Sequence, residues 1–475
     1  MRAIHRKVVR PRAAVRSTGG VEFRLAKRHL LTQESDFTDD PLSWLLRAAG
    51  RSNPIVPVDG ARGIARASDS AGTVAVFGAN AVRAVLSDSE TFGMPVSISA
   101  RYAFPPILTK LNSALFSMTG APHRRRQRVL SRALGPTFSQ MRYAAIDRGL
   151  TIYLGNFGDK QDNFDVDLFD SMRRLARIVA VQVIFGDQPG GNEIGAVAQL
   201  YFDLRRRYAS KEEFRQPVDL DTLISVGTRL DSLLRSQVRS ARGRLHADDA
   251  GLIQHLCRTD GAFDDDDLVA HANILFMSSS EPIATAMTWI VLALSQDFAL
   301  CHRIRADLAY GSAALVHGLV REVLRVVPPS AIIARLTTRR AVIGGTALPV
   351  KTEILISPFV EHRRARVFRD PHRFFPDRWG TLQPGPFEYL PFGGGVRSCL
   401  GKRIALETLE RATAALVQRF DVLLPRPQSL DWRMNTTLQP AAQPLVRFTR
   451  PGNYKGSENE LSGKAAELLC VDRDR

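Results

Sequence analysis

The pattern of hydrophobic and polar positions predicts a mainly α-helical protein with small β-sheets. Between about residues 121 and 325, apolar positions recur with a helical period, and clusters of Gly, Asp and Pro interrupt them. The predicted helices span residues 41–48, 79–86, 121–135, 138–155, 167–186, 218–241, 264–296 and 313–326. The predicted strands span residues 72–77, 332–338, 341–343 and 353–356.

The most apolar segment, residues 268–296, predicts a long helix through a protein core. Only His271 and Glu281 are titratable within it, and as a single helix it would be about 43 Å long. A membrane span is the competing interpretation. The Ser-Ser-Ser-Glu-Pro sequence at 278–282 argues against a span, because a bilayer would meet an ionisable group and a broken hydrogen-bond ladder there. Pro282 predicts a kink or an unwound turn.

The formal net charge of +17 is unevenly distributed along the chain. Residues 1–30 carry nine Lys and Arg side chains and one acidic side chain, so we expect a flexible basic arm there, with a targeting peptide or surface anchor as the alternative. We expect one folded domain over residues 31–450 and a disordered tail over residues 451–475. No nucleic-acid partner is expected, since the arm lacks interleaved aromatic residues and no binding motif is apparent.

Composition and cysteine content indicate a globular protein of a reducing compartment. Hydrophobic residues make up 44% and charged residues 24% of the chain, which excludes a disordered, collagen-like or coiled-coil protein. The length alone would allow about three domains, but no linker-like stretch separates them. Four scattered cysteines do not form a disulfide framework, and no signal peptide or long apolar run opens the chain. We therefore expect a cytoplasmic protein without a membrane span.

The segment Phe-Gly-Gly-Gly-Val-Arg-Ser-Cys-Leu-Gly at 392–401 carries the strongest chemical signal. Its glycines allow the backbone to turn sharply and to pass close to a large flat ligand. Arg397 places a cation two residues before the Cys399 thiol, and a helix is predicted from Lys402. A thiolate is stabilised beside a cation and a helix N-terminus. A lone cysteine is usually a small buried residue, but this surrounding pattern favours a metal ligand.

These residues match the pattern F-x-x-G-x-R-x-C-x-G, and the segment resembles the haem-binding loop of cytochromes P450. All five fixed positions are present: Phe392, Gly395, Arg397, Cys399 and Gly401. Two further motifs of that family precede it in the family's order, E-x-x-R at 322–325 and D-P-x-x-F-x-P-x-R-W at 370–379. E-x-x-R alone carries no weight because ion pairs at this helical spacing are common. The order and spacing of all three motifs argue against chance.

The resemblance implies a single, large, triangular, mostly helical domain that holds haem b between the helix at 268–296 and the Cys399 loop. Cys399 would be the proximal axial ligand, and thiolate donation favours O–O cleavage over reversible oxygen binding. Glu322, Arg325 and Arg378 would form a buried ion-pair network behind the haem. We expect that network to be structural, since an unpaired buried charge costs several kcal/mol.

The same resemblance implies that cations hold the haem propionates. The candidates are His123, Arg335 and Arg397. Relatives often carry Arg four residues after the His, and this chain has Gln127 there. Arg128, or the nearby Arg124, would then be the substitute.

The predicted oxygen-activating segment departs from the family's pattern. Many members carry an acid followed by Thr in the long helix, and here the acid is retained as Glu281 while Pro282 replaces Thr. Ser279 lies on about the same helix face and could hold a replacement water. Glu281 could equally be a structural carboxylate that points away from the haem.

Three functions remain open from the sequence. The first is a haem-thiolate monooxygenase of secondary metabolism, which inserts one oxygen atom from O2 into an apolar small molecule. The second is a peroxide-dependent peroxygenase or an oxygen-independent isomerase or dehydratase, because neither reaction needs the missing Thr. The third is a non-catalytic haem protein, against which Cys399 argues. We favour the monooxygenase because Glu281 is retained.

A monooxygenase of this kind needs an electron donor, and the chain shows no flavin or nicotinamide fingerprint. We expect a ferredoxin or flavodoxin-type donor with an NAD(P)H reductase, acting on a monomer. Two arginine clusters could form the docking surface: Arg124, Arg125, Arg126, Arg128 and Arg132, and then Arg363, Arg364, Arg366, Arg369 and Arg373. Residues 93–118 and 187–217, with Tyr102, Tyr201 and Arg205, are expected to border the substrate pocket.

Overall fold

The computed structural model describes most of the chain between residues 37 and 469. The described residues are 37, 39–58, 71–95, 104–135, 138–157, 163–187, 190–209, 219–243, 251–259, 262–452 and 460–469. The basic arm at 1–30 and Tyr102 therefore lie outside the described residues, as do parts of the two segments expected to border the pocket.

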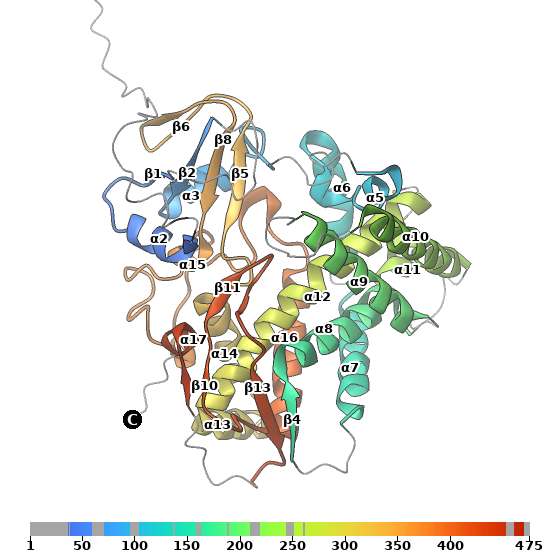
Figure 1. Cartoon of the computed structure of the whole chain (residues 1–475), viewed down its shortest axis with the longest axis vertical. Helices are drawn as coiled ribbons and strands as arrows, with labels where there is room; N and C mark the ends of the chain where they lie inside the picture. Colours follow the sequence, from blue (N-terminus) through green and yellow to red (C-terminus); the bar gives the residue numbers. More distant parts are fainter. Residues whose placement is uncertain are drawn as a thin grey trace, which may run out of the picture.

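Helices form most of the regular structure (Figure 1). They are α2 (Pro41–Ala48), α3 (Ala79–Ser87), α5 (Pro106–Leu111), α6 (Gly120–Ala133), α7 (Ser139–Gly155), α8 (Leu168–Phe185), α9 (Gly191–Ala209), α10 (Leu220–Gly243), α11 (Leu252–Cys257), α12 (Asp265–Gln296), α13 (Phe298–Ala309), α14 (Ala314–Val326), α15 (Pro358–Glu361), α16 (Lys402–Arg419) and α17 (Lys464–Leu468). Short 3-10 turns are η1 (Leu115–Ser117), η3 (Pro376–Gly380) and η4 (Gly395–Arg397).

The strands form several small sheets. They are β1 (Ile55–Pro57), β2 (Gly72–Val76), β3 (Phe92–Gly93), β4 (Asn163–Asp167), β5 (Ile333–Thr337), β6 (Ala341–Ile343), β7 (Thr346–Leu348), β8 (Thr352–Ile356), β9 (Asp421–Leu423), β10 (Gln428–Ser429), β11 (Trp432–Met434), β12 (Leu438–Pro440), β13 (Leu445–Thr449) and β14 (Leu461–Ser462). The largest sheet has the order β1-β2-β8-β5-β3, and β2 pairs parallel to β8. The predicted class, mainly α with small sheets, is confirmed.

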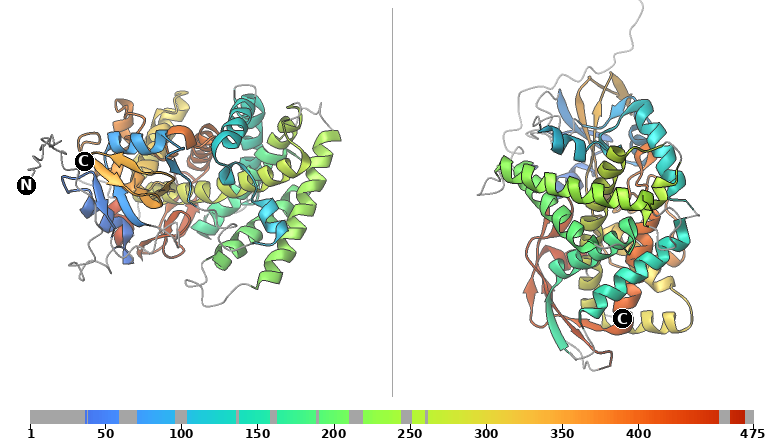
Figure 2. Two further views of the ribbon diagram at one scale, coloured as in Figure 1. Left: turned by 90° about the horizontal axis from the view of Figure 1, so that it is seen from above. Right: turned by 90° about the vertical axis from the view of Figure 1, so that its right-hand side faces the viewer.

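The long helix α12 crosses the middle of the molecule, between the sheets and the other helices (Figures 1 and 2). It begins at the N-cap Asp264, whose side chain accepts a hydrogen bond from the Asp267 amide at 2.7 Å. Acidic residues in its first turn complement the helix dipole. Among the described residues it is the one helix long and apolar enough to cross a membrane, and most of its most apolar window is buried within the protein.

The helix continues through Pro282 without an unwound turn, so that part of the prediction is wrong, while a kink at Pro282 stays a prediction. The positions on both sides of Pro282 are buried and packed, which holds the helix together where one backbone hydrogen bond is lost. Ser279 and Ser280 donate their hydroxyl protons to carbonyls of the preceding turn. The serine hydroxyls are thereby satisfied inside the helix.

The structure corrects the expected C-terminal tail for residues 460–469. There β14 pairs parallel to β10, and α17 follows. Leu461 and Leu468 are buried, and Lys464 Nζ lies 2.9 Å from an Asp40 carboxylate oxygen. Apolar residues at this spacing bury one side of the segment against the main core, which a composition-based prediction of disorder does not detect.

Two segments outside the predicted helices also contain helices. The segment 93–118 includes α5, and the segment 187–217 includes α9. The polar residues of α9 weaken its helical period in the sequence, so packing against α8 and α10 contributes more to its formation than local preference does.

Candidate active site

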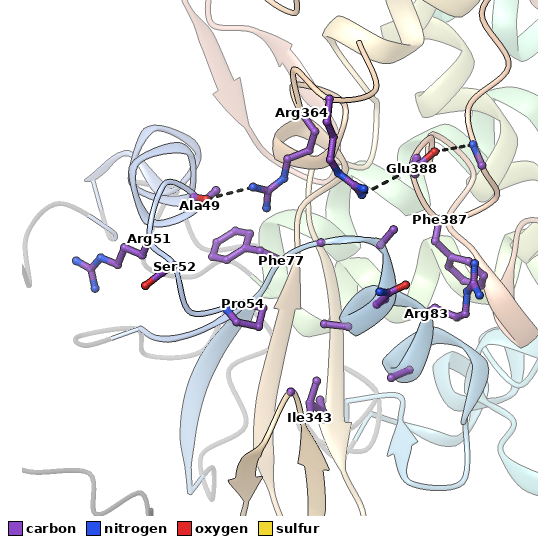
Figure 3. Close-up of a pocket in the computed structure, with 18 of the residues that line it drawn as sticks. Ala49, Arg51, Ser52, Pro54, Phe77, Arg83, Ile343, Arg364, Phe387 and Glu388 are labelled. Atoms are coloured by element: carbon purple, nitrogen blue, oxygen red, sulfur yellow. Dashed lines mark hydrogen bonds and ion pairs between the residues drawn. The ribbon is translucent and has the colours of Figure 1, made fainter. Parts of the chain in front are cut away.

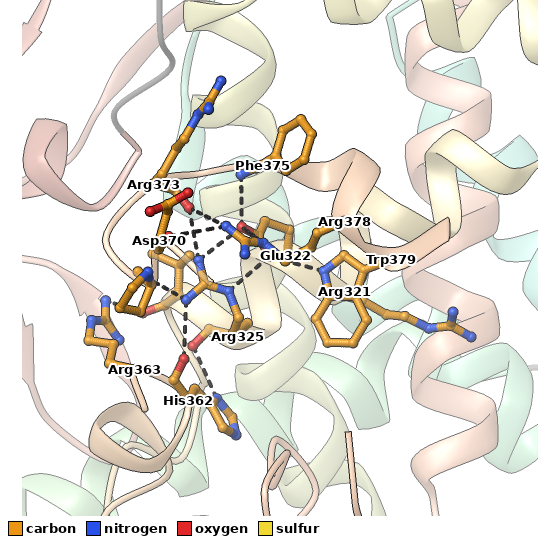
Figure 4. Close-up of polar contacts among 12 residues, drawn as sticks. Arg321, Glu322, Arg325, His362, Arg363, Asp370, Arg373, Phe375, Arg378 and Trp379 are labelled. Atoms are coloured by element: carbon orange, nitrogen blue, oxygen red, sulfur yellow. Dashed lines mark hydrogen bonds and ion pairs between the residues drawn. The ribbon is translucent and has the colours of Figure 1, made fainter. Parts of the chain in front are cut away.

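The E-x-x-R motif lies in α14 at the centre of a buried polar network (Figure 4). Glu322 and Arg325 are both fully buried, and two hydrogen bonds of 2.9 Å join guanidinium to carboxylate. Glu322 also accepts hydrogen bonds from Arg378 Nε at 3.1 Å, from the Phe375 amide at 2.8 Å and from Trp379 Nε1 at 3.0 Å. The structure brings the three predicted residues together, and the desolvated charges are compensated.

His362 extends this network, and sequence reasoning missed it. Its Nε2 accepts a hydrogen bond from the Leu390 amide at 2.7 Å, so Nδ1 carries the proton and donates to the Arg325 carbonyl oxygen at 3.0 Å. Burial lowers the pKa of His362 to about 3, and the ring is neutral near pH 7. His362 therefore joins the end of α14 to the residues just before the cysteine loop. Its sequence neighbours gave no signal of this contact.

The cysteine loop is closed by its own backbone. The Cys399 amide donates to the Phe392 carbonyl oxygen at 2.9 Å. Gly395 has φ +65°, and an added Cβ there would clash with the backbone carbonyl of Leu86 in α3, so only glycine fits. Burial raises the pKa of the Cys399 thiol, whereas hydrogen bonds from the backbone amides of Gly401 and Lys402 act to lower it. Cys399 thus lies at the N-terminus of α16.

A cationic group surrounds this loop without acidic partners among the described residues. Burial and the nearby Arg397 lower the pKa of Arg335 to about 10. Burial, Arg397 and Arg124 lower the pKa of His123 to about 4. Arg335 Nη1 donates to the Ala334 carbonyl oxygen at 2.8 Å, while Arg397 Nε is buried without a hydrogen-bond partner. Three basic groups that lack a carboxylate fit the two propionates of a haem, so the donor set present here matches that cofactor.

The structure does not bring Arg128 to this group. Arg128 is exposed, and its Nε donates to the Arg124 carbonyl oxygen at 3.3 Å. Gln127 instead donates through Nε2 to the Val396 carbonyl oxygen at 2.8 Å. The residue that replaces the family's Arg therefore contacts the cysteine loop through a neutral hydrogen bond.

Glu281 and Ser279, the two predicted catalytic residues, make separate contacts. Glu281 is buried, and its Oε1 accepts a hydrogen bond from Gln439 Nε2 at 2.6 Å. Its carboxylate also lies 3.4 Å from Arg173 Nε and 3.9 Å from Arg206 Nη1. Burial raises the pKa of Glu281, although both arginines act to lower it. The Ser279 hydroxyl donates to the Leu275 carbonyl oxygen at 2.8 Å, which commits its proton to the helix.

Part of the second arginine cluster is structural. Arg363 donates to the carbonyl oxygens of Phe359 and Val326, each at 2.9 Å. Arg364 donates to the Ala49 carbonyl oxygen at 3.1 Å and pairs with Glu361. Arg364 contributes to the wall of a surface pocket of about 780 Å³ (Figure 3). The prediction that this cluster as a whole forms a docking surface is therefore wrong for these two residues.

The first cluster retains an exposed basic face on α6. Arg124 pairs with Glu90, and Arg126 pairs with Asp267. The other three members of the cluster are exposed and form no ion pair with the described residues; they are Arg125, Arg128 and Arg132. Their spacing places them on one side of the helix.

Comparison with known proteins decides the family. The family model for cytochrome P450 matches residues 69–446. The chain belongs to the cytochrome P450 family. The resemblance inferred from the motifs is confirmed, and membership of this family implies a haem-iron oxidoreductase with a thiolate ligand.

Curated P450 relatives match parts of the chain. Cytochrome P450 137 of Mycobacterium tuberculosis is 30% identical over 185 residues, which are 38% of this chain and 38% of that relative. Cytochrome P450 139 of Mycobacterium bovis is 25% identical over 342 residues, 66% of this chain and 78% of the relative. Cyclooctatin synthase of Streptomyces melanosporofaciens is 31% identical over 192 residues, 36% of this chain and 42% of that enzyme. The match to the first of these relatives spans less than half of its length.

Solved P450 structures share the fold. A zebrafish P450 solved with progesterone has a TM-score of 0.70 at 20% identity, over 86% of this chain and 99% of that chain. The P450 CYP175A1 of Thermus thermophilus has a TM-score of 0.68 at 22% identity, over 88% of this chain and 99% of that chain. At these identities the likeness shows the architecture of this P450 and leaves its substrate to chemical argument.

Proposed function

We propose that this P450 is a monooxygenase that inserts one oxygen atom from O2 into an apolar small molecule. The observation that carries the proposal is the juxtaposition of the Cys399 loop with three basic groups, together with the retained acid Glu281 on α12. Cys399 would ligate haem b, and His123, Arg335 and Arg397 would bind its propionates. When bound, a thiolate-ligated haem supplies the electron donation that favours O–O cleavage.

Glu281 is suited to take up and release a proton. Its Oε2 is buried without a hydrogen-bond partner, and burial raises its pKa. Arg173 lies 3.4 Å from Oε2, and it also lines a small surface pocket of about 200 Å³. The Glu281 carboxyl therefore has a polar connection, through Arg173, to the outside of the protein.

Pro282 supports the second candidate function, a peroxygenase or an oxygen-independent isomerase or dehydratase. Pro282 offers no hydroxyl, and the Ser279 proton is committed to a helix carbonyl. In a monooxygenase, ordered water or a hydroxyl group of the substrate must then supply the proton that Thr usually relays. A peroxide-dependent or rearranging enzyme has no such need.

The electron donor is proposed to be an acidic ferredoxin or flavodoxin-type protein served by an NAD(P)H reductase. The exposed face of Arg125, Arg128 and Arg132 supports this choice, since it has no acidic partner in the described part of the chain. The same helix contacts the cysteine loop through Gln127. We further propose that the enzyme acts as a cytoplasmic monomer.

An oxidant comparison tests this function. The haem-loaded full chain is incubated with a panel of apolar compounds under three conditions: ¹⁸O2 with donor, reductase and NADPH; hydrogen peroxide alone; and no oxidant. A product that forms only under the first condition and contains ¹⁸O supports the monooxygenase. A product formed equally well with peroxide alone, or without any oxidant, would transfer the assignment to the second candidate.

A further inference from the structure

Helices α5, α9 and α12 come together near the N-terminal half of α12 (Figure 1), and four polar residues lie there. Tyr201 and Arg205 lie one turn apart on α9, Asn112 directly follows α5, and Asn273 belongs to α12. Tyr201, Asn112 and Asn273 are buried. Asn273 Nδ2 donates to the Leu111 carbonyl oxygen at 2.8 Å, which ties α12 to the end of α5.

Asn112 fixes the orientation of the groups around it. Its Nδ2 donates to the Leu108 carbonyl oxygen at 2.6 Å and to Tyr201 Oη at 3.0 Å. Its Oδ1 accepts a hydrogen bond from Arg205 Nη1 at 2.6 Å. Because a carbonyl can only accept, the amide orientation is determined, and Tyr201 Oη acts as an acceptor here. The Tyr201 phenol proton remains available to a further acceptor.

Arg205 is a cation without an anion. No carboxylate of the described residues forms an ion pair with it, and burial lowers its pKa with only Tyr201 opposing that shift. The adjacent Arg206 differs, because it lies 3.7 Å from Asp203 and 3.9 Å from Glu281. Since desolvated cations in proteins are normally paired, the described part of this cluster lacks one negative charge.

Asn273 has an unsatisfied polar atom close to this cluster. Its side chain is fully buried, and its Oδ1 has no hydrogen-bond partner among the described residues. Buried polar atoms in folded proteins are nearly always satisfied. Asn273 Nδ2 reaches the backbone beside Asn112, but Asn273 Oδ1 can only accept, so it requires a donor such as water and is not a contact for a carboxylate.

We propose that Arg205 and Tyr201 form a carboxylate-binding subsite, oriented by Asn112, for a substrate with an apolar body and one carboxylate group. The guanidinium and the phenol proton are both donors, and a carboxylate accepts both. This inference rests on the proposed function. Along α12, Asn273 precedes Glu281 by two turns, about 12 Å. The subsite therefore binds the carboxylate end and leaves a remote carbon to be oxidised.

Binding calorimetry on the haem-loaded full chain tests the subsite. The probes are decanoic and tetradecanoic acid, each paired with the primary alcohol of the same chain length. The wild-type protein should bind each acid at least about tenfold more tightly than its alcohol. R205Q should remove that preference while changing the affinity for the alcohols less than about threefold.

Two further variants and a control separate recognition from folding. Y201F removes the phenol hydroxyl, which is both the proposed donor to the carboxylate and the acceptor for Asn112 Nδ2, and should weaken acid binding by about three- to tenfold; R205K should retain part of the preference. R229Q changes an exposed arginine on α10 and should leave both affinities unchanged. An equal affinity for acid and alcohol in the wild type, or a preference that survives in both R205Q and Y201F, would overturn the proposal.

The experiments distinguish a failure of the carboxylate-subsite proposal from a failure of the monooxygenase proposal. Calorimetry detects carboxylate binding whether or not the protein inserts oxygen. An acid preference in a protein that yields no ¹⁸O-labelled product would reject the monooxygenase alone. Labelled product without an acid preference would reject the carboxylate subsite alone.

Discussion

At the scale of single residues, neutral hydrogen bonds complement the charges around the cysteine loop. Gln127 contacts Val396 where relatives often place an arginine, and His362 connects the Arg325 carbonyl with the Leu390 amide. Both contacts join the loop region to elements distant in sequence. Neither is visible in the motifs, because each depends on a tertiary arrangement that a local pattern does not contain.

His362 should make the protein sensitive to acid. Burial lowers its pKa to about 3 in the folded state, against about 6.5 in the unfolded chain. Between these values the unfolded state binds a proton that the folded state does not, so stability falls as the pH falls. The contribution is about 1.4 kcal/mol per pH unit. H362N should reduce the pH dependence of the unfolding free energy by about that amount between pH 4 and pH 6.

Denaturant titrations over this pH range measure the slope directly. H302N, at an exposed position on α13, is the matched control and should retain the wild-type slope. Equal slopes for H362N and the wild type would show that His362 is not held neutral in the folded protein.

At the scale of elements, Pro282 affects α12 in two ways: it removes one backbone hydrogen bond, and it replaces the Thr of the family's pattern. Pro282 lies inside the helix and leaves the carbonyl of the preceding turn without its backbone donor. The sequence predicted the helix and its core location correctly. It overestimated the local effect of proline, because the buried residues on both sides keep the helix intact.

Replacing Pro282 separates these two effects. P282A and P282T both restore the backbone donor and should raise the free energy of unfolding by roughly 1–3 kcal/mol. P282T also restores a hydroxyl beside Glu281, so a larger share of the electrons from NADPH should end in product rather than in peroxide. The ratio of product to NADPH consumed provides the measurement. If P282A and P282T give the same ratio, the hydroxyl has no role in proton delivery here.

The C-terminal segment is a second element with a measurable role. A chain that ends at Gly452 loses the buried residues of β14 and α17 and should lose several kcal/mol of stability, since each buried leucine contributes roughly 1.5–3 kcal/mol. A chain that ends at Leu469 keeps them and is the control. Equal melting temperatures for the two chains would contradict the packing described for 460–469.

At the scale of the whole molecule, the basic side chains behind the net charge of +17 lie in different environments. Part of it belongs to the N-terminal arm, which lies outside the described residues. Other arginines contact groups within the protein; Arg325, Arg363 and Arg364 are examples. The exposed face of α6 remains as a surface for an acidic partner. Charge counts in the sequence could not distinguish these uses, because burial and pairing are properties of the folded chain.

Charge reversal on α6 should slow electron transfer. The triple variant R125E/R128E/R132E should lower the rate of reduction by an acidic donor by at least about tenfold at low salt, and the difference should shrink as salt is added. R229E/R239E/R433E reverses three exposed arginines elsewhere and is the control. Unchanged reduction rates across salt concentrations would exclude this face as the docking surface.

Features that depend on contiguous motifs could be predicted from the sequence, whereas contacts between elements distant in the sequence could not. The cysteine loop and the E-x-x-R network follow from contiguous motifs, and the network predicted for Glu322, Arg325 and Arg378 is present. The partners of Glu281 lie on α8, α9 and β12, far away in the sequence. The Arg205 cluster likewise needs three elements to be packed together. Neither group of contacts produces a local sequence pattern from which it could be predicted.

The reduced carbon monoxide difference spectrum tests the central claim most directly, that Cys399 is the thiolate ligand of a bound haem. The folded, haem-loaded protein should show a band at about 450 nm, as expected for thiolate ligation. C399S should bind carbon monoxide without that band. A folded, haem-loaded wild-type protein that lacks the band would contradict the account.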